Sequence, residues 1–298
     1  MEDALISQVR SFSRVVTQRV GALNDRFLAR DRSLGESRLL WEIGPDGQEV
    51  RSLRVNLDLD SGYLSRLLRS LESDGLVTVE TDGSDRRVRR ARLTSAGRRE
   101  RALLDRRSDE LAASLLEHLT AHQRTHLVEA MAQVERLLTA AIVRVEPLDP
   151  GHPRARECLA EYFGELDRRF DAGFDPALSI AADSEELRPP AGVLLVATLR
   201  SQAIGCGALK LHPGEPAEIK RMWVAESARG LGVGRRVLAE LETYAADHGT
   251  DRVRLETNRA LVEAIGLYRS AGYAEVAPFN DEPYAHHWFE KALRPTPA

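Results

Sequence analysis

The stretch Arg229-Gly230-Leu231-Gly232-Val233-Gly234 is the most informative part of the chain, because glycines alternate there just before an amphipathic segment begins. Residues 219–224, which precede it, have the composition of a strand, and residues 235–241, which follow it, have the apolar spacing of a helix. Glycines let a backbone approach a ligand closely. The first N–H groups of a helix have no partner within it, and the helix dipole adds partial positive charge there. The stretch therefore predicts an anion cradle, with a pyrophosphate as the natural occupant.

The spacing of the glycines separates two kinds of nucleotide site. A dinucleotide-binding fold has the pattern Gly-x-Gly-x-x-Gly, with an acidic residue about 20 residues later. Here the pattern is Arg-x-x-Gly-x-Gly with Gly230 in addition, which resembles the acetyl-coenzyme A signature of the GNAT N-acetyltransferases. Three further segments carry the same resemblance in the family's order, and they are residues 217–224, 255–258 and 267–273. The resemblance extends over about residues 142–293.

This resemblance implies an α/β fold around a central mixed, mostly antiparallel sheet, with acetyl-coenzyme A as the cofactor. By motif position, the cofactor-binding residues lie on the strand before the loop, in the loop itself and at the end of the next strand. They are Met222, Trp223, Val224, Arg229, Gly230, Leu231, Gly232, Val233, Gly234, Arg235 and Asn258. Backbone N–H groups near Val224 would polarise the thioester carbonyl.

Acetyl transfer to an amine needs a base for the amine and an acid for the departing thiolate. A free alkyl amine has a pKa near ~10 and is mostly charged at neutral pH, so a base must remove its proton. The resemblance implies Glu218 as this base and Tyr268 as the acid. Two other interpretations stay open. Glu218 can instead pair with a neighbouring arginine or hold the ammonium without taking its proton, and Tyr268 can be a core aromatic of its helix.

The acceptor is less well defined by the sequence. Lys220 and Arg221, beside Glu218, favour an acceptor that carries a carboxylate, such as an amino acid or a peptide terminus. Residues 162–174 and the segment around Tyr284 and His286 are the candidates for lining the acceptor pocket. The identity of the acceptor is left open.

The first 140 residues have the pattern of a helical domain with one hairpin. The predicted elements are helices over 3–30, 35–43, 49–55 and 61–74, strands over 76–80 and 88–93, and two long helices over 95–118 and 121–141. Asp82-Gly83 is a strong signal for the turn between the strands. An apolar stripe of leucines on residues 61–74 leaves arginines on the opposite side of that helix.

This half resembles the MarR-family winged helix-turn-helix regulators, through residues 62–72, 74–77, 85–87 and 93–97. The resemblance implies a recognition helix over 61–74 in the major groove of double-stranded DNA and a hairpin wing in the minor groove. The residues that would contact DNA are Ser65, Arg66, Arg69, Arg86 and Arg87. It also implies a homodimer through the helices over 3–30 and 95–141. Residues 50–57 are more polar than the helix usual there, which leaves the docking of that helix open.

Charge is unevenly distributed along the chain. The net charge of −4 includes a basic segment, because residues 51–107 hold 14 Arg against 9 Asp and Glu. Such an excess of arginine indicates nucleic-acid binding, although a solvated surface biased toward arginine would show the same excess. Two scattered cysteines and the lack of an apolar run of bilayer length favour a cytoplasmic protein without a disulfide framework. No Cys/His spacing indicates a metal.

The sequence therefore predicts two domains, residues 1–140 as a mainly-α winged helix-turn-helix domain and residues 142–298 as a GNAT domain. The predicted function combines a DNA-binding transcriptional regulator with an N-acetyltransferase of a small amine. The alternatives are a transcription factor whose second domain only senses acetyl-coenzyme A, and a protein acetyltransferase targeted to DNA. The operator, the sign of regulation and any coupling between the domains are not determined.

Overall fold

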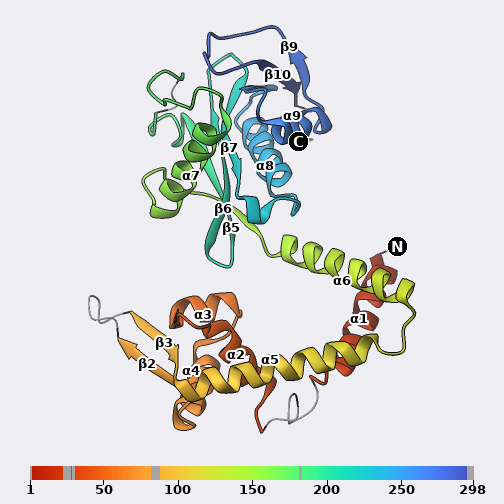
Figure 1. Ribbon diagram of the computed structural model, residues 1–298. Coiled ribbons are helices and arrows are strands. Elements are labelled where there is room, and N and C mark those ends of the chain that lie inside the picture. The colour runs from red at the N-terminus through yellow and green to blue at the C-terminus, as the bar shows by residue number, and fades with distance from the viewer. Residues whose placement is uncertain (1, 23–27, 29–30, 82–87, 181–182, 294–298) are drawn as a thin grey trace. The chain divides into compact units, whose positions relative to one another are not determined.

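Figure 1 shows the computed structural model, which describes residues 2–22, 28, 31–81, 88–180 and 183–293. Its contacts divide the chain into two compact units, Met1–Met131 and Ala132–Ala298. The division falls within helix α6 (Ala121–Ala141), so the domain limits of 1–140 and 142–298 stay a prediction. Among the described residues, no helix combines the length and the apolar character that crossing a bilayer requires.

The N-terminal unit has the order of elements that defines a winged helix. Its elements before α6 are α1 (Glu2–Arg19), α2 (Leu34–Ile43), β1 (Gln48–Glu49), α3 (Val50–Asn56), α4 (Ser61–Ser73), β2 (Val77–Thr81), β3 (Arg89–Leu93) and α5 (Ser95–Leu116). The strands pair antiparallel in the order β1-β3-β2. The predicted mainly-α winged helix-turn-helix architecture is confirmed.

Helix α1 is shorter than the predicted helix over residues 3–30. It ends at Arg19, and Gly21 follows with a φ of 68°, in the left-handed region that commonly terminates helices. Residues 23–27, which the predicted helix included, lie outside the described residues. Helix α1 therefore has about two thirds of the predicted length.

Local sequence explains helix α4 and its neighbours. Asp60 caps α4 by accepting a hydrogen bond from the N–H of Tyr63 at 2.8 Å. Four leucines of α4 are buried in one cluster with side chains from α2, the hairpin and α5. Helix α3 also docks on this cluster, because Leu53 is fully buried despite the polar composition of residues 50–57. The doubt about its docking is thereby removed.

Gly97 allows α5 to cross the hairpin at close range. A Cβ at this position would lie 2.0 Å from the carbonyl oxygen of Leu76, far inside van der Waals contact. Thr94 caps the same helix by accepting a hydrogen bond from the N–H of Gly97 at 3.0 Å. The predicted helix start at residue 95 is confirmed, and Gly97 is required by packing.

The C-terminal unit is a sheet with helices on both faces (Figure 1). Its elements after α6 are β4 (Arg144–Pro147), α7 (Pro153–Arg169), β5 (Gly192–Leu199), β6 (Gln202–Lys210), β7 (Ala217–Val224), the short 3-10 helix η2 (Glu226–Ala228), α8 (Val233–Asp247), β8 (Arg252–Thr257), α9 (Val262–Ser270), β9 (Ala274–Val276) and β10 (His287–Ala292). The described strands lie in the order β4-β5-β6-β7-β8-β10-β9. Only β7 and β8 pair parallel, so the predicted mixed, mostly antiparallel sheet is confirmed.

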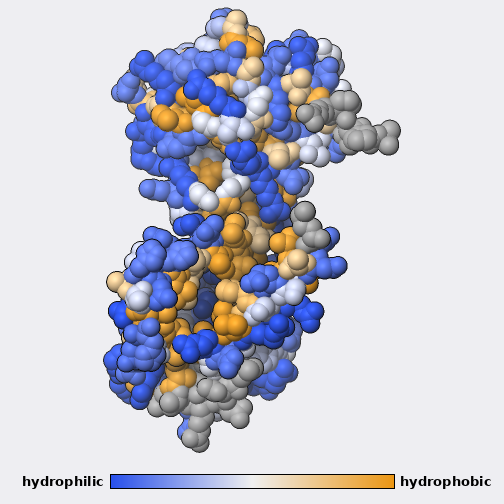
Figure 2. Space-filling model, turned by 90° about the vertical axis from the view of Figure 1, so that its right-hand side faces the viewer, coloured by the Kyte–Doolittle hydropathy of each residue, from blue (hydrophilic) through white to orange (hydrophobic). Residues whose placement is uncertain are grey.

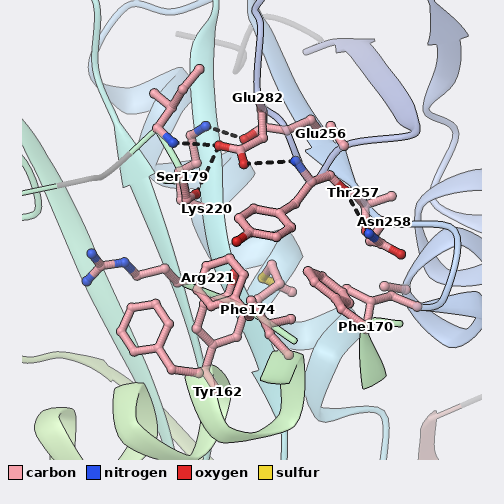
Figure 3. Close-up of a pocket in the computed structure, with 18 of the residues that line it drawn as sticks. Tyr162, Phe170, Phe174, Ser179, Lys220, Arg221, Glu256, Thr257, Asn258 and Glu282 are labelled. Carbon is pink, nitrogen blue, oxygen red and sulfur yellow. Dashed lines mark hydrogen bonds and ion pairs between the residues drawn. The ribbon is translucent and has the colours of Figure 1, made fainter. Parts of the chain in front are cut away.

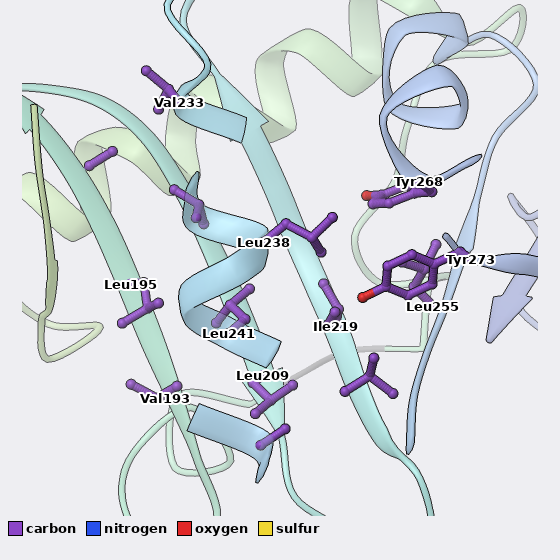
Figure 4. Packing of buried hydrophobic residues seen from close by; sticks show 14 of the residues in the cluster. Val193, Leu195, Leu209, Ile219, Val233, Leu238, Leu241, Leu255, Tyr268 and Tyr273 are labelled. Carbon is purple, nitrogen blue, oxygen red and sulfur yellow. The ribbon is translucent and has the colours of Figure 1, made fainter. Parts of the chain in front are cut away.

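Alternation along the central strands builds a core on each face of this sheet. On β5, Val193, Leu195 and Ala197 face the cluster that contains α8 and α9, which Figure 4 shows. The intervening Leu194 and Val196 belong to a second cluster with residues of α7. The two cores hold α7 and α8 against opposite faces and thereby position the elements that form the site.

The parallel strands β7 and β8 separate soon after they meet. They pair only at Ala217 with Val253 and at Glu218 with Arg254, although β7 continues to Val224. β7 also has a bulge a few residues further on. Its pairing register with β6 shifts there, and Arg221 has a φ of 55°. The separation leaves the second half of β7 without a neighbour on the β8 side, and this is where the cavities lie.

Candidate active site

The larger of the two cavities beside β7, of about 480 Å³, lies along the glycine loop. Its lining comes from the end of β7, the loop before α8, and facing residues of α7 and α9. The predicted cofactor residues on this lining are Met222, Trp223, Val224, Arg229, Gly230, Gly232, Val233, Gly234 and Arg235. We call this cavity the cofactor cleft.

The start of α8 has the geometry of an anion cradle. Gly232 is the residue before the first helical turn, and its φ of 75° is left-handed. A Cβ at Gly230 or Gly232 would meet nothing within 4 Å, so the space above the loop is open to a ligand. The first-turn N–H groups have no partner within the helix and carry the positive end of its dipole. The chain thus has a place for a pyrophosphate where the sequence predicts it.

Ion pairs join the glycine loop to α7. The guanidinium of Arg229 donates to Glu165 Oε1 at 2.6 Å, and the indole N–H of Trp223 donates to Glu165 Oε2 at 2.9 Å. Arg169 contacts the same Glu165 and reaches Glu263 of α9 at 2.7 Å. Glu165 therefore holds two arginines at the cleft, where the cofactor's phosphates would need cations.

Two predicted cofactor residues lie elsewhere. Leu231 packs against the core beneath the loop. Asn258 lines the neighbouring cavity, where its side chain donates to the carbonyl of Tyr284 at 2.7 Å and accepts from the N–H of Ala260 at 2.9 Å. Both ends of the amide are thus used to hold the chain after β8. In this structure neither side chain reaches the cofactor cleft.

The smaller cavity, of about 140 Å³, adjoins the cofactor cleft, and we call it the acceptor pocket. Figure 3 shows its lining, which is rich in aromatic side chains from α7, the loop after it and the loop before β10. Tyr162, Met222 and Tyr268 line both cavities and therefore stand where the two meet.

Tyr268, the predicted acid, lies at this junction. Its side chain is buried against Tyr273 and Phe289, with ring centroids at 5.8 and 6.0 Å. Among the described residues, none forms a hydrogen bond with its hydroxyl. Burial, followed by the negative charge of Glu256, raises the pKa of the Tyr268 phenol, which favours the protonated form at neutral pH. The ring is therefore packed in the core while its hydroxyl is left for a ligand.

Glu218 is not on the lining of either cavity. Its carboxylate accepts hydrogen bonds from Arg254 at 2.9 and 3.1 Å, and Lys220 lies 3.6 Å away. Burial acts to raise the pKa of Glu218, but the charges of Lys220 and Arg254 outweigh it and hold that pKa below its usual range. The alternative interpretation, a carboxylate paired with a neighbouring arginine, describes the position that the structure gives this residue.

Glu256 is a second carboxylate of this part of the sheet, and it lines the acceptor pocket. It lies on β8, next to the buried Leu255, so strand alternation turns its side chain away from the core that Leu255 enters. The ammonium of Lys220 contacts Glu256 directly and links it to Glu218. Glu256 was not among the site residues predicted from the sequence. The alternation of buried and pocket-facing residues on β8 is the signal that could have identified it.

In the N-terminal unit, α4 presents the predicted recognition surface. Arg66 and Arg69 are exposed and Ser65 is half-buried, on the side opposite the leucine stripe. Arg69 donates to the carbonyl of Ser65 at 3.1 Å, and the guanidinium of Arg66 lies 5.6 Å from the centre of the Tyr63 ring. The predicted wing residues Arg86 and Arg87 lie outside the described residues.

Comparison with known proteins identifies the family. Residues 156–273 match the model of the acetyltransferase (GNAT) family. The chain is 33% identical over 130 residues to the IAA acetyltransferase of Azospirillum brasilense, which covers 43% of this chain and 84% of that protein. It is 31% identical over 157 residues to an uncharacterised N-acetyltransferase of Schizosaccharomyces pombe, which covers 51% of this chain and 92% of that protein. The chain belongs to the GNAT family.

The chain is accordingly an N-acetyltransferase that uses acetyl-coenzyme A. A solved structure of MarR from E. coli aligns with a TM-score of 0.38 and 23% identity, over 42% of this chain and 93% of that one. Within the described part of the chain, no cluster of three or more His, Cys, Asp or Glu could hold a metal ion.

The cofactor cleft fits the cofactor that the family uses. The open space above Gly230 and Gly232 suits a pyrophosphate, and Arg229 and Arg235 supply positive charge beside it. On its β8 side, the second half of β7 has no paired strand and offers backbone groups to the rest of an extended ligand. When bound, acetyl-coenzyme A supplies the acetyl group as a thioester.

Proposed function

We propose that the acceptor is a small amine and that the acceptor pocket binds it. The observation that carries this proposal is a cavity that meets the cofactor cleft at Tyr162, Met222 and Tyr268. The N–H of Asp175 donates to the Tyr284 hydroxyl at 2.9 Å, which fastens the loop after α7 to the loop before β10. A protein acceptor would need an open groove at this place, and the fastened loops favour a small molecule instead.

In the proposed reaction, Tyr268 gives its proton to the departing sulfur as the carbon–sulfur bond breaks and the nitrogen–carbon bond forms. The phenol suits this role because burial keeps it protonated and its hydroxyl has no described partner. The competing sensor-only function needs no acid at this place, so Tyr268 favours catalysis. Solvent would return the proton to Tyr268 after each turnover.

We assign the contact with the reacting amine to Glu256. It lines the acceptor pocket, and its charge acts on both Tyr162 and Tyr268 at the junction with the cofactor cleft. Glu218, the base expected from the family resemblance, would act as a positioning residue that holds Lys220 against Glu256. The amine's proton would leave through the Glu256 carboxylate or a water that it orients.

A screen of amines for thiol release from acetyl-coenzyme A tests the proposed activity. At least one small primary amine should stimulate release, and an unfolded or lysine-containing protein at equal amine concentration should do so far less. Stimulation by proteins alone would replace the small-amine function with protein acetylation. Binding of acetyl-coenzyme A without stimulation by any acceptor would support the sensor function.

We further propose that the N-terminal unit binds double-stranded DNA as a transcriptional regulator. The supporting observation is the winged-helix order of elements, with Arg66 and Arg69 exposed on α4. Selection of genomic fragments by the full-length protein should recover a pseudo-palindromic site. Equal retention of all fragments at moderate salt would reduce the interaction to non-specific charge attraction.

A homodimer is part of the same proposal. Helix α1 buries no residue of its own, and its large apolar side chains are exposed to between 38% and 65%: Leu5, Ile6, Val9, Phe12, Val15 and Val16. Figure 2, which views the side of the molecule where α1 lies in Figure 1, shows apolar side chains gathered there. A second copy of the chain would cover them. Sedimentation should give a dimer, and a monomer at micromolar concentration would contradict the proposal.

A further inference from the structure

Glu282 is a buried carboxylate of the acceptor pocket without a cationic partner. The residue is 8% exposed and lies in the loop before β10. Its Oε2 accepts hydrogen bonds from Ser179 Oγ at 2.9 Å and from the N–H of Ile180 at 2.7 Å, and its Oε1 accepts one from the N–H of Tyr284 at 3.3 Å. Among the described residues, none forms an ion pair with it. Neutral donors orient the carboxylate but leave its charge without a partner.

Glu256, the other carboxylate of the pocket, differs in this respect. The ammonium of Lys220 contacts Glu256 directly and also lies 3.6 Å from Glu218. The lysine's charge is therefore shared by two carboxylates on the sheet and is not directed to Glu282. A cation brought by the ligand would complement Glu282 without displacing a described ion pair.

Three aromatic rings line the acceptor pocket together with Glu282. The ring centroids of Phe170, Phe174 and Tyr284 lie 4.8 to 5.8 Å from one another, and the Phe170 and Phe174 rings meet edge to face. All three rings line the acceptor pocket. Ring faces grouped in this way attract a cationic nitrogen, and the attraction grows when the cation is removed from water. The carboxylate and the rings therefore favour the same kind of ligand group.

Glu282 lies away from the place where the two cavities meet. Tyr162 and Tyr268 line both cavities, whereas Glu282 and the three rings line the acceptor pocket alone. Figure 3 draws Glu282 and Tyr162 on opposite sides of the pocket. The nitrogen that receives the acetyl group must lie beside the cofactor cleft. A ligand cation at Glu282 would therefore be a second nitrogen of the same acceptor.

We propose that the acceptor is a small molecule with two basic nitrogens, one acetylated beside Tyr268 and one held as an ammonium by Glu282 and the aromatic rings. This inference rests on the proposed small-amine function and specifies its substrate class. It differs from the carboxylate-bearing acceptor that Lys220 and Arg221 suggested from sequence. Lys220 is engaged by Glu256 and Glu218, and the guanidinium carbon of Arg221 lies 5.4 Å from the centre of the Phe163 ring.

The test compares amines that differ only at the far end. The set is n-butylamine, 4-amino-1-butanol and 1,4-diaminobutane, with the matching five-carbon compounds, and the measured quantity is kcat/KM. A charge-assisted contact predicts that the diamine exceeds both matched compounds by about tenfold or more. Glu282→Gln should bring the diamine close to the amino alcohol, since glutamine keeps an acceptor oxygen for Ser179 and Ile180.

Asp281→Asn is the matched control, because Asp281 is exposed, carries the same charge and is the adjacent residue outside the pocket lining. It should leave the diamine preference in place. Equal kcat/KM for diamines and monoamines would overturn the second nitrogen but keep the small-amine function. If no amine is acetylated, calorimetric titration with the diamine distinguishes the outcomes. Diamine binding that Glu282→Gln weakens would support the cation site without the activity. Absence of diamine binding would overturn both the cation site and the small-amine function.

Discussion

Replacing Tyr268 with phenylalanine separates chemistry from packing. The substitution removes one oxygen atom and keeps the ring that packs against Tyr273 and Phe289. Because the hydroxyl has no described hydrogen-bond partner, its loss leaves no buried group unsatisfied, and the free energy of unfolding should change by less than about 0.5 kcal/mol. A positioned general acid contributes about 10²–10⁴-fold to a rate. We therefore expect kcat to fall by roughly that factor, equivalent to about 3–5 kcal/mol of transition-state stabilisation.

Tyr273→Phe is the matched control, because the same atom is removed from a neighbouring buried tyrosine. The Tyr273 hydroxyl donates to Glu242 Oε1 at 2.9 Å and does not line either cavity. Its loss should cost about 1–3 kcal/mol of stability and leave kcat within about twofold. The assays are acetyl transfer at saturating acetyl-coenzyme A, calorimetric cofactor affinity and thermal unfolding. Full turnover in Tyr268→Phe, or equal loss in both variants, would refute the assignment of Tyr268 as the acid.

Three further predictions follow from single sites. Gly232→Val should weaken binding of acetyl-coenzyme A at least about tenfold, because the valine side chain would enter the space above the loop. Gly249→Val is the control for backbone strain alone, since Gly249 has a similar φ of 79° and equally open surroundings. Glu218→Gln should lower stability by about 1–3 kcal/mol at neutral pH. The pKa of Glu218 is lowered in the folded chain, so the stability it contributes is present above the unfolded pKa of about 4.3 and is lost as pH falls through the folded value. Arg69→Ala should cost about 1–3 kcal/mol of operator binding if the side chain reads a base.

Each of these predictions has an outcome that contradicts it. Equal cofactor affinities for the Gly232 and Gly249 variants would remove the loop from the cofactor site. The stability difference between Glu218→Gln and the wild type should disappear in acid. If it persists unchanged there, the ion pair of Glu218 is not the source of that difference. Arg107→Ala, an exposed arginine on α5, is the control for general charge. An equal loss of DNA binding in Arg107→Ala and Arg69→Ala would contradict base reading by α4.

Local signals in the sequence were sufficient to predict most helices and strands and the anion cradle at the start of α8. The glycine spacing at residues 230–234 predicts an anion cradle at a helix start, and α8 begins there, directly after Gly232. The leucine stripe of α4 and the cap at Asp60 likewise define that helix without any long-range contact. These features depend on residues a few positions apart, whose geometry the backbone determines.

The roles of the charged residues were decided only by tertiary structure. Glu218 and Arg254 lie 36 residues apart, and their pairing depends on the register between β7 and β8. The same sheet turns Glu256 into the acceptor pocket, and two loops far apart in the chain leave Glu282 there without a cation. A carboxylate's role depends on which charges surround it after folding, and those charges come from strands and loops that sequence spacing alone does not bring together.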